Sequence, residues 1–268
     1  MNAKDPDRRV VLLTGATGAI GKAIALQIAV KPGYELVLLC RDKHRARQAV
    51  RDIQHCSANE NVSYELVDLS SQNSIQELAR IRQEPVHVLI NNAAVTPRRR
   101  RETSDGIELQ FATNVLGYFW MIQALRNQLQ TGAPARVVNV ASYWAGDLAL
   151  DDLEFRRRRY DNNRAYRQSK QADRMLTAAF ARRLKDHGVT VNACHPGDVN
   201  SLLSNNLGFG GSESPQQAAR TPAWLATADI GQQETGGYFE HMRRQHCRFA
   251  ADVEAVEALY AACLSYQP

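Results

Sequence analysis

Short apolar runs alternate with longer amphipathic stretches along most of the 268 residues. Near-continuous apolar runs are typical of strands buried on both faces of a parallel sheet, and the stretches between them are typical of covering helices. The runs expected to form strands are residues 10–13, 35–40, 62–67, 86–90, 136–140, 189–194 and 236–239. Right-handed crossovers between such strands build a Rossmann-type, doubly wound α/β fold. The sequence therefore predicts a mostly parallel, seven-stranded sheet with helices on both faces.

The helices and the domain organisation follow from the same pattern. Helices are expected at residues 21–30, 43–56, 72–83, 105–130, 163–187 and 252–264. A single domain over residues 1–268 is expected, because this length builds one large core and nothing requires a second. Residues 1–8 are expected to be a polar tail. Residues 198–230, rich in Ser, Asn, Gly and Pro, follow a strand and are expected to form a substrate lid.

The charge distribution argues against nucleic acid as a partner. The net charge is +5, and two arginine runs, at residues 98–101 and 156–159, supply much of the excess. Nucleic-acid-binding surfaces combine basic residues with aromatics or belong to a recognisable module, and neither feature is present. Solvated loops are the preferred interpretation, and a positive field near an anionic cofactor is the alternative.

Neither a membrane span nor a metal site is predicted. No apolar run approaches the roughly 18 residues that a span needs, and residues 1–9 lack the apolar segment of a secretory signal. A cytoplasmic location is therefore expected. The five cysteines are dispersed without a CxxC pair, which indicates a reduced protein without zinc-ligand spacing.

A glycine-rich turn, Thr14-Gly15-Ala16-Thr17-Gly18-Ala19-Ile20-Gly21, joins the first predicted strand to the first predicted helix. Gly15 permits a tight turn, and a second small residue lets the backbone approach a pyrophosphate. Gly21 allows the helix to pack close to the strand, and the helix amino terminus faces the negative charge. The position of this turn between strand and helix predicts a dinucleotide site.

The end of the second predicted strand indicates which dinucleotide binds. An acidic residue at that position would accept hydrogen bonds from a ribose 2′-hydroxyl and indicate NAD. Cys40 stands there instead, followed by Arg41, whose guanidinium can pair with a 2′-phosphate. NADP is therefore predicted. Because Asp42 comes next, a shift of the strand end by one residue would favour NAD.

Tyr166 and Lys170 stand four residues apart in the predicted helix at 163–187, and therefore share one face. An ammonium beside a phenol favours the phenolate, so Lys170 is expected to lower the pKa of Tyr166 from its ordinary value of about 10. A tyrosine tuned in this way exchanges a proton with a carbonyl oxygen near neutral pH. The pair predicts acid–base chemistry on a carbonyl or an alcohol.

Taken together, these motifs make the chain resemble the short-chain dehydrogenase/reductase family over nearly its whole length. The landmarks occur in the family's order: Thr14–Gly21, Asp68, Asn91-Asn92-Ala93-Ala94, Asn114, Ser142, Tyr166 with Lys170, and Pro196-Gly197. Local segments such as Asn114-Val115-Leu116-Gly117 resemble the retinol-dehydrogenase-like branch of NADP-linked reductases. The resemblance implies an oxidoreductase that transfers a hydride between NADP(H) and a carbonyl or alcohol substrate.

The resemblance also implies residue roles. Tyr166 would be the general acid/base, Lys170 would lower its pKa and hold the nicotinamide ribose, and Ser142 would hydrogen-bond the substrate oxygen. Asn114 would support a water through which Lys170 exchanges protons. With the glycine turn, the expected cofactor-binding set is Gly15, Thr17, Gly18, Ala19, Ile20, Gly21, Arg41, Asp68, Leu69, Asn92, Ala93, Ala94, Tyr166, Lys170, Pro196, Gly197 and Val199.

Two departures from the family pattern keep alternatives open. Ala19 stands where the family's middle glycine is expected, so the spacing becomes the GxxGxxG of longer, epimerase-like relatives. A sugar-nucleotide epimerase or dehydratase is therefore one alternative, and a catalytically idle NADP-binding scaffold is another. Asn200 replaces the usual threonine near the nicotinamide amide, where its side chain can still hydrogen-bond.

Apolar residues around the predicted site favour a hydrophobic carbonyl substrate without identifying it. They are Tyr143, Trp144, Leu148, Leu202, Leu203, Leu207 and Phe209, and packing of the lid is the alternative role for several of them. The helices at 105–130 and 163–187 are expected to form the homodimer or homotetramer interface usual in the family. Phe119 and Trp120 are alternatively core residues.

Overall fold

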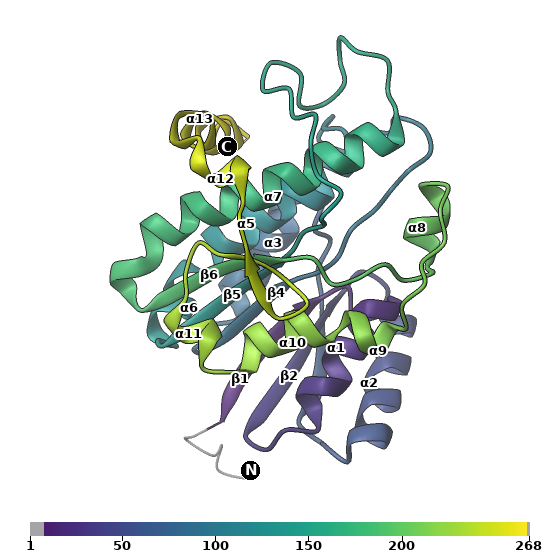
Figure 1. The fold of residues 1–268 in the computed structure, drawn as a ribbon. Helices are drawn as coiled ribbons and strands as arrows, with labels where there is room; N and C mark the ends of the chain where they lie inside the picture. The colour runs from purple at the N-terminus through teal and green to yellow at the C-terminus, as the bar shows by residue number, and fades with distance from the viewer. Residues whose placement is uncertain (1–7, 267–268) are drawn as a thin grey trace.

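A computed structural model describes residues 8–266, so the predicted tail at residues 1–8 lies, except for Arg8, outside the described residues. A single mixed sheet runs through the molecule, with helices on both sides (Figure 1). Its strands are β1 Arg9–Thr14, β2 Tyr34–Cys40, β3 Val62–Leu66, β4 Val88–Asn91, β5 Ala135–Val140, β6 Val189–Cys194, β7 Tyr238–Glu240 and β8 Arg243–Gln245. Their order is β3-β2-β1-β4-β5-β6-β7-β8, and all neighbours are parallel except β7 and β8.

Within residues 8–266 the sheet has eight strands, so the predicted number of seven is wrong by one. The additional strand, β8, is a three-residue edge strand that pairs antiparallel with β7 and is exposed throughout. Its sequence, Arg-Arg-Gln, has no apolar residue because neither of its faces is covered. A search for apolar runs could not detect it.

Two layers of helices cover the sheet. The helices are α1 Ala19–Ala29, α2 Lys43–Ser57, α3 Gln72–Ile81, α4 Leu109–Phe111, α5 Gly117–Ala124, α6 Arg126–Thr131, α7 Asn162–Leu184, α8 Leu202–Asn206, α9 Pro215–Ala218, α10 Arg220–Thr227, α11 Ile230–Gln233, α12 Arg248–Ala251 and α13 Val253–Leu264. In β1, Val11 and Leu13 pack with α1, α2 and α10, whereas Leu12 packs with α3, α5, α7 and α13. This alternation follows from the period of two in a strand.

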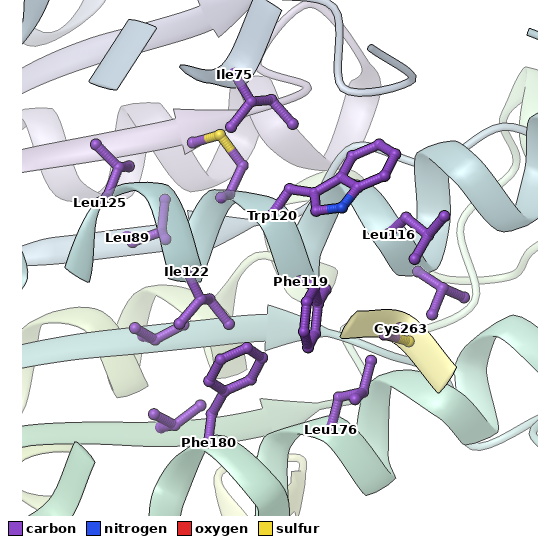
Figure 2. Close-up of a cluster of buried hydrophobic side chains, with 14 of the residues drawn as sticks. Ile75, Leu89, Leu116, Phe119, Trp120, Ile122, Leu125, Leu176, Phe180 and Cys263 are labelled. Atoms are coloured by element: carbon purple, nitrogen blue, oxygen red, sulfur yellow. The ribbon is translucent and has the colours of Figure 1, made fainter. Parts of the chain in front are cut away.

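Aromatic side chains fill the core between α5 and α7. Figure 2 shows Phe119 pointing toward Phe180, with Cys263 of α13 nearby. The ring centroids of Phe119 and Phe180 are 5.3 Å apart, and Tyr260 of α13 lies 5.2 Å from Phe119 and 5.4 Å from Phe180. Tyr260 meets both phenylalanine rings edge-on, and edge contacts between aromatic rings stabilise beyond the area that they bury. The helix α13 is therefore part of the core, and it covers α5 and α7.

The predicted long helix at residues 105–130 is wrong, because the segment is divided. It begins at α4, where the Glu108 carboxylate accepts hydrogen bonds from the amides of Gln110 and Phe111. A short π-helix follows at Ala112–Leu116 and leads into α5. The chain then changes direction at Leu125, where α6 begins. The bend lets the Gln128 side chain of α6 reach carbonyl groups at the end of α3.

The predicted lid at residues 198–230 is also divided. Residues around α8 lie at the surface, with Leu202 79% exposed, and α8 stands away from the sheet at the side of the molecule (Figure 1). From Ala218 to Ala226, however, most side chains are buried, and α10 packs on the sheet with Ala223 and Leu225 in the core. The stretch able to act as a lid therefore ends before α10.

The arrangement places the carboxyl ends of β1, β4, β5 and β6 at one edge of the sheet, because these strands are parallel neighbours. Chain connections leave β1 toward β2 on one side and β4 toward β5 on the other, so the order of strands reverses between β1 and β4. In such sheets, ligands bind outside the carboxyl ends of the strands at this reversal. Among residues 8–266, no helix is both long enough and apolar enough to cross a bilayer.

Candidate active site

The glycine turn holds β1 and α1 in close contact. Gly15 has φ +71°, in the left-handed region, and a Cβ at this residue would lie 2.8 Å from the Cα of Ala93. A Cβ on Gly21 would lie 2.2 Å from the carbonyl oxygen of Gly15. Both positions therefore need glycine, in one case for the turn and the close approach and in the other for packing.

The first turn of α1 is open to an anion. Gly18 caps the helix with an extended backbone, and within the described chain no side chain bonds the free amides of this turn. Gly18 and Ala19 are exposed, while Thr17 and Ile20 are half-buried. Uncapped amides at a helix amino terminus attract negative charge. The turn therefore fits a pyrophosphate, and the Ala19 methyl group lies at the surface rather than against the sheet.

The Thr14 side chain ties the ends of β1 and β4 together. Its hydroxyl accepts hydrogen bonds from the amides of Asn92 and Ala93, at 2.8 and 3.0 Å, and it donates to the carbonyl of Ile90. The side-chain Nδ2 of Asn92 in turn donates to the Thr14 carbonyl at 2.9 Å. The segment from Asn92 to Ala94 is thus fixed beside the glycine turn. Thr14, which holds it, was predicted only as the first residue of the glycine turn.

Asp68 and Leu69 follow β3 at the same edge. The Asp68 carboxylate accepts hydrogen bonds from the amide and the hydroxyl of Ser70, at 2.9 and 2.7 Å. Leu69 is buried beneath α5, and a Cβ on Gly117 would lie 2.8 Å from the Leu69 carbonyl oxygen. The turn after β3 is therefore rigid, and its predicted contact with an adenine stays a prediction.

The end of β2 coincides with the residue assumed in the prediction of NADP. β2 ends at Cys40, and Arg41 follows as an exposed residue without a hydrogen-bonding partner in the described part of the chain. Asp42 caps α2, its carboxylate accepting a hydrogen bond from the amide of Arg45 at 2.8 Å. The Arg45 guanidinium reaches the carbonyl of Thr17 at 3.1 Å. A second cation, which the sequence analysis missed, thus lies beside the glycine turn.

Asn114 lies in the π-turn before α5. Its side chain binds both backbone groups of Val95, accepting from the amide at 2.8 Å and donating to the carbonyl at 3.0 Å. It also lies 3.4 Å from the Ser169 hydroxyl of α7. Single π-turns within helices occur often at functional sites. Asn114 therefore links the segment after β4 to the helix that carries Tyr166.

Tyr166, Lys170 and Ser142 come together beside the end of β5. Ser142 follows that strand; its hydroxyl lies near the Tyr166 phenol and acts to lower the pKa of that phenol, and it accepts a hydrogen bond from the amide of Trp144 at 3.1 Å. The Lys170 ammonium lies 5.9 Å from the centroid of the Tyr166 ring and donates to the Val140 carbonyl at 2.9 Å. The structure thus brings three of the four predicted catalytic side chains into one cluster. Asn114 is linked to it through the Ser169 hydroxyl, which donates to the Tyr166 carbonyl.

The predicted direction of the Tyr166 pKa is wrong for this structure. Burial raises the pKa of the phenol above its ordinary value, and this effect exceeds the lowering by Lys170 and by the hydrogen bond from Ser142. Tyr166 is only 8% exposed, and removing water disfavours the charged phenolate. The sequence analysis identified the cation beside the phenol but could not predict how deeply the pair is buried.

Two charged residues of α7 that follow Lys170, Asp173 and Arg174, were not among the predicted site residues. The Asp173 carboxylate lies 2.8 Å from the Lys170 ammonium. The Arg174 guanidinium donates to the Ser142 carbonyl and to the Tyr238 hydroxyl, and it stacks over the Tyr238 ring at 3.5 Å. The signal was their spacing, three and four residues after Lys170 on the same helix.

The predicted nicotinamide-flanking segment follows β6. Gly197 has φ +137°, and a Cβ there would lie 1.8 Å from a carboxylate oxygen of Glu213. That carboxylate also accepts a hydrogen bond from the amide of Asp198 at 3.1 Å. Val199 is buried and forms a bridge with Glu213. The segment after Pro196 is thus held by Glu213, a residue that the sequence analysis did not single out.

Only part of the predicted apolar pocket lies beside Tyr166. The Trp144 ring lies 6.0 Å from the Tyr166 ring and 5.2 Å from the Phe209 ring. Leu148, in contrast, packs against the core, and Leu207 is buried. Trp144 therefore gives the phenol an aromatic neighbour, and Phe209 extends this aromatic surface by packing on Trp144.

The two arginine runs, far apart in the sequence, lie together. The Arg100 guanidinium donates to the Glu154 carbonyl at 3.0 Å, and the Tyr160 hydroxyl donates to the Pro97 carbonyl at 3.0 Å. Arg156 donates to the carbonyl of Gly106 at 3.1 Å. Figure 1 shows these two long loops next to each other at the top of the molecule. The predicted loop locations are confirmed, although the convergence was not foreseen.

Comparison with known proteins agrees with the family resemblance that the sequence motifs indicate. Residues 9–208 match the family model described as short chain dehydrogenase. Retinol dehydrogenase 13 from Mus musculus is 37% identical over 257 residues, which cover 88% of this chain and 77% of that protein. Retinol dehydrogenase 13 from Homo sapiens is 35% identical, covering 94% of this chain and 82% of that protein.

Solved structures share the fold. A protein from Mycobacterium paratuberculosis superimposes with a TM-score of 0.79 at 29% identity, covering 96% of this chain and 92% of that one. An actinorhodin polyketide ketoreductase with NADPH has a TM-score of 0.66 at 23% identity, covering 88% of this chain and 97% of the other. At that identity the second likeness shows the fold alone.

Proposed function

Because the chain belongs to the short-chain dehydrogenase/reductase family, and is thus an oxidoreductase acting on alcohols and carbonyls, we propose that it uses NADP(H) and an apolar substrate, with Tyr166 as general acid/base. The observation that carries this proposal is the cluster of Tyr166, Ser142 and Lys170 at the carboxyl end of β5. Because the strands are parallel, the cluster lies at the same sheet edge as the glycine turn.

In the direction of reduction, Tyr166 gives its phenolic proton to the substrate oxygen. Ser142 donates a hydrogen bond to the same oxygen and stabilises the charge that develops there. The Lys170 ammonium opposes the effect of burial on the phenol and stabilises the phenolate that remains. When bound, the nicotinamide supplies the hydride, and the protein's part is orientation and electrostatics. Burial of the pair keeps water away from the reacting oxygen.

The proposed choice of NADP rests on two arginines. Arg41 follows β2 as an exposed residue with no hydrogen-bonding partner among residues 8–266, and Arg45 reaches the glycine turn. Asp42, the residue that would favour NAD, has one carboxylate oxygen engaged in capping α2. A guanidinium that has no partner in the protein can bind a phosphate through two hydrogen bonds. This arrangement supports a 2′-phosphate rather than a free 2′-hydroxyl.

The proposed preference for an apolar substrate rests on Trp144, which lies beside Tyr166, and on Phe209, which packs against Trp144. Aromatic and apolar side chains dominate the lining of small-molecule sites, where a few polar groups fix orientation. Here those polar groups are Ser142 and Tyr166. A hydrophobic aldehyde or ketone matches this combination.

The epimerase or dehydratase alternative, based on the GxxGxxG spacing, is not supported by the comparisons, which point to oxidoreductases. Turnover of a carbonyl substrate would distinguish the proposed enzyme from a catalytically idle NADP-binding scaffold. The predicted cytoplasmic location stays a prediction.

The decisive experiment follows NADPH oxidation with a panel of aldehydes and ketones that differ in size and polarity, with NADH measured alongside. We expect turnover with NADPH, highest for apolar carbonyls. Turnover of sugar nucleotides instead, or tight NADPH binding without any carbonyl reduction, would contradict the proposal.

A further inference from the structure

The Lys170 ammonium has a buried carboxylate as its partner. Lys170 and Asp173 are 2% and 1% exposed, and the ammonium lies 2.8 Å from one Asp173 oxygen. Residues three apart on a helix share a face, so the pair forms within α7. The Val140 carbonyl is the other acceptor for this ammonium. The lysine at the centre of the proposed site is therefore an ion-pair member before any cofactor binds.

Packing alone does not explain a charge at residue 173. Withdrawing a carboxylate from water is costly, and an apolar residue of similar size is often at least as stabilising at such a place. The other Asp173 oxygen, Oδ1, has no hydrogen-bond partner within residues 8–266. Among the described residues, the Asp173 carboxylate therefore accepts no hydrogen bond from the surrounding fold other than the one from Lys170.

The groups around the pair come from four elements. Tyr166 lies on α7 itself, and the ring of Tyr118 on α5 has its centroid 5.2 Å from the Lys170 ammonium. Cys194 of β6 also interacts with Lys170, and Cys263 of α13 interacts with Asp173. Burial raises the pKa of both thiols, so neither contributes a charge. The charges acting on Tyr166 are thus Lys170 and Asp173 on its own helix and Asp198 in the segment after β6, whose carboxylate also raises the pKa of the phenol but does not contact Lys170.

We propose that Asp173 is a positioning residue that keeps Lys170 as an ammonium and limits how strongly its charge acts on the Tyr166 phenol. The inference rests on the proposed function. Its consequence is that Asp173, although it contacts neither substrate nor cofactor in the proposed scheme, sets the pH range over which Tyr166 works.

Two opposing effects follow from the position of Asp173. Burial by itself would lower the pKa of Lys170, but Asp173, together with Tyr118 and Tyr166, raises it. The same carboxylate raises the pKa of Tyr166, whereas Lys170 lowers it. Asp173 thus guarantees the positive charge and also partly cancels its field at the phenol.

Asp173 itself titrates in an accessible range. Burial raises its pKa to about 6, against the opposite effect of Lys170. As the pH falls through this value the carboxyl becomes neutral while Lys170 stays charged, so the ammonium acts more strongly on Tyr166. Above this value the carboxylate weakens that action.

The test replaces Asp173 by asparagine, which keeps the size and an acceptor but removes the charge. We expect Asp173→Asn to move the inflection assigned to Tyr166 in the pH profile of kcat/KM for carbonyl reduction down by about one pH unit. Glu257→Gln is the matched control, because Glu257 also pairs with arginines of α7 but at its distal end. The control should leave the profile unchanged. Equal profiles for Asp173→Asn and wild type would overturn the proposal.

A second measurement needs neither turnover nor a variant at residue 173. In the wild-type protein, carbon NMR of the Asp173 carboxyl should show titration near pH 6, and the Tyr166 ring carbon signal should shift over the same interval. Signals are assigned with Tyr166→Phe. A Tyr166 signal that does not shift over the pH interval in which Asp173 titrates would contradict the inference. A coupled shift in a protein that reduces no carbonyl would instead contradict the proposed function alone.

Discussion

Tyr166 is the residue on which the proposed chemistry depends. Its phenol is buried with Ser142 and beside Lys170, and phenylalanine would keep the ring while removing the exchangeable proton. We expect Tyr166→Phe to lower kcat for carbonyl reduction by about 10²–10⁴-fold, the usual contribution of a positioned acid or base. NADPH affinity, measured by fluorescence titration, should change little. A variant with wild-type turnover would show that another group supplies the proton.

Arg41 should decide the preference between the two dinucleotides. It is exposed after β2 and free to bind a 2′-phosphate. We expect Arg41→Ala to reduce kcat/KM for NADPH by about tenfold or more, because a charge-assisted hydrogen bond contributes about 1.5–3 kcal/mol, while kcat/KM for NADH stays nearly constant. Lys43→Ala, at the exposed start of α2, is the control for loss of a nearby positive charge. Equal losses with both dinucleotides would refute this role.

Sequence spacing predicted the proposed site best where one helix or one turn holds it. Tyr166 and Lys170 lie on one helix, and Gly15 and Gly21 lie in one turn, so local geometry was enough. The partners that cross between elements, such as Thr14 with Asn92 and Arg174 with Ser142, depend on tertiary contacts. The extent of burial, which reverses the direction of the Tyr166 pKa, is likewise a property of the whole fold.

Among the elements, the turn at residues 152–158 depends on a single carboxylate. Asp152 accepts hydrogen bonds from the amides of Arg156, Arg157 and Arg158, and from the Arg158 guanidinium. Burial acts to raise the pKa of Asp152, but these bonds outweigh it and lower the pKa to about 2. The stabilisation is therefore fully present above the ordinary carboxyl pKa of 3.8 and is lost as the pH falls toward 2.

We expect Asp152→Ala to lower the free energy of unfolding by about 1–3 kcal/mol at pH 7, because several amides lose their acceptor. The difference from wild type should shrink between about pH 4 and pH 2, where the wild-type carboxyl becomes protonated. Urea unfolding at a series of pH values measures this. Asp151→Ala serves as the control, because Asp151 is exposed and its ion-pair partner among the described residues is the exposed Arg157. A difference that is independent of pH would count against the carboxylate as the cause.

Helix boundaries were predicted well where a cap marks them and poorly where tertiary contacts set them. α2 and α7 begin after Asp42 and Asp161, whose carboxylates accept from amides of the first turn. Apolar residues dominate residues 115–122 and no proline interrupts 105–130, so periodicity could not indicate the π-helical turn around Asn114 or the bend at Leu125. Those features arise because Asn114 binds Val95 and Gln128 binds the end of α3.

At the scale of the whole molecule, α13 bears on the predicted assembly. The sequence predicts a homodimer or homotetramer through the helices at 105–130 and 163–187. In the structure, Tyr260 packs on Phe119 and Phe180, and α7 is almost entirely buried from Ala165 to Ala181. Assembly through α7 would require α13 to move away.

We therefore expect a monomer in sedimentation velocity at micromolar concentration. Leu259→Asp, which places a charge on the buried face of α13, should release that helix and promote self-association through the exposed aromatic side chains. Glu254→Gln, on the exposed side of α13, should leave the monomer intact. A wild-type dimer whose cross-links map to α7 would contradict the expectation.

The joined arginine loops have a consequence for how the molecule opens. Segments around Pro97 and Tyr160 are more than 60 positions apart in the chain, yet each supplies the other's anchoring hydrogen bonds. Neither can detach alone without leaving its counterpart's donors and acceptors to water, so both should become accessible to trypsin and to amide exchange at the same rate. Proteolytic cleavage of one loop should therefore increase amide exchange in the other, and the two loops would open together as one cooperative unit beside the sheet.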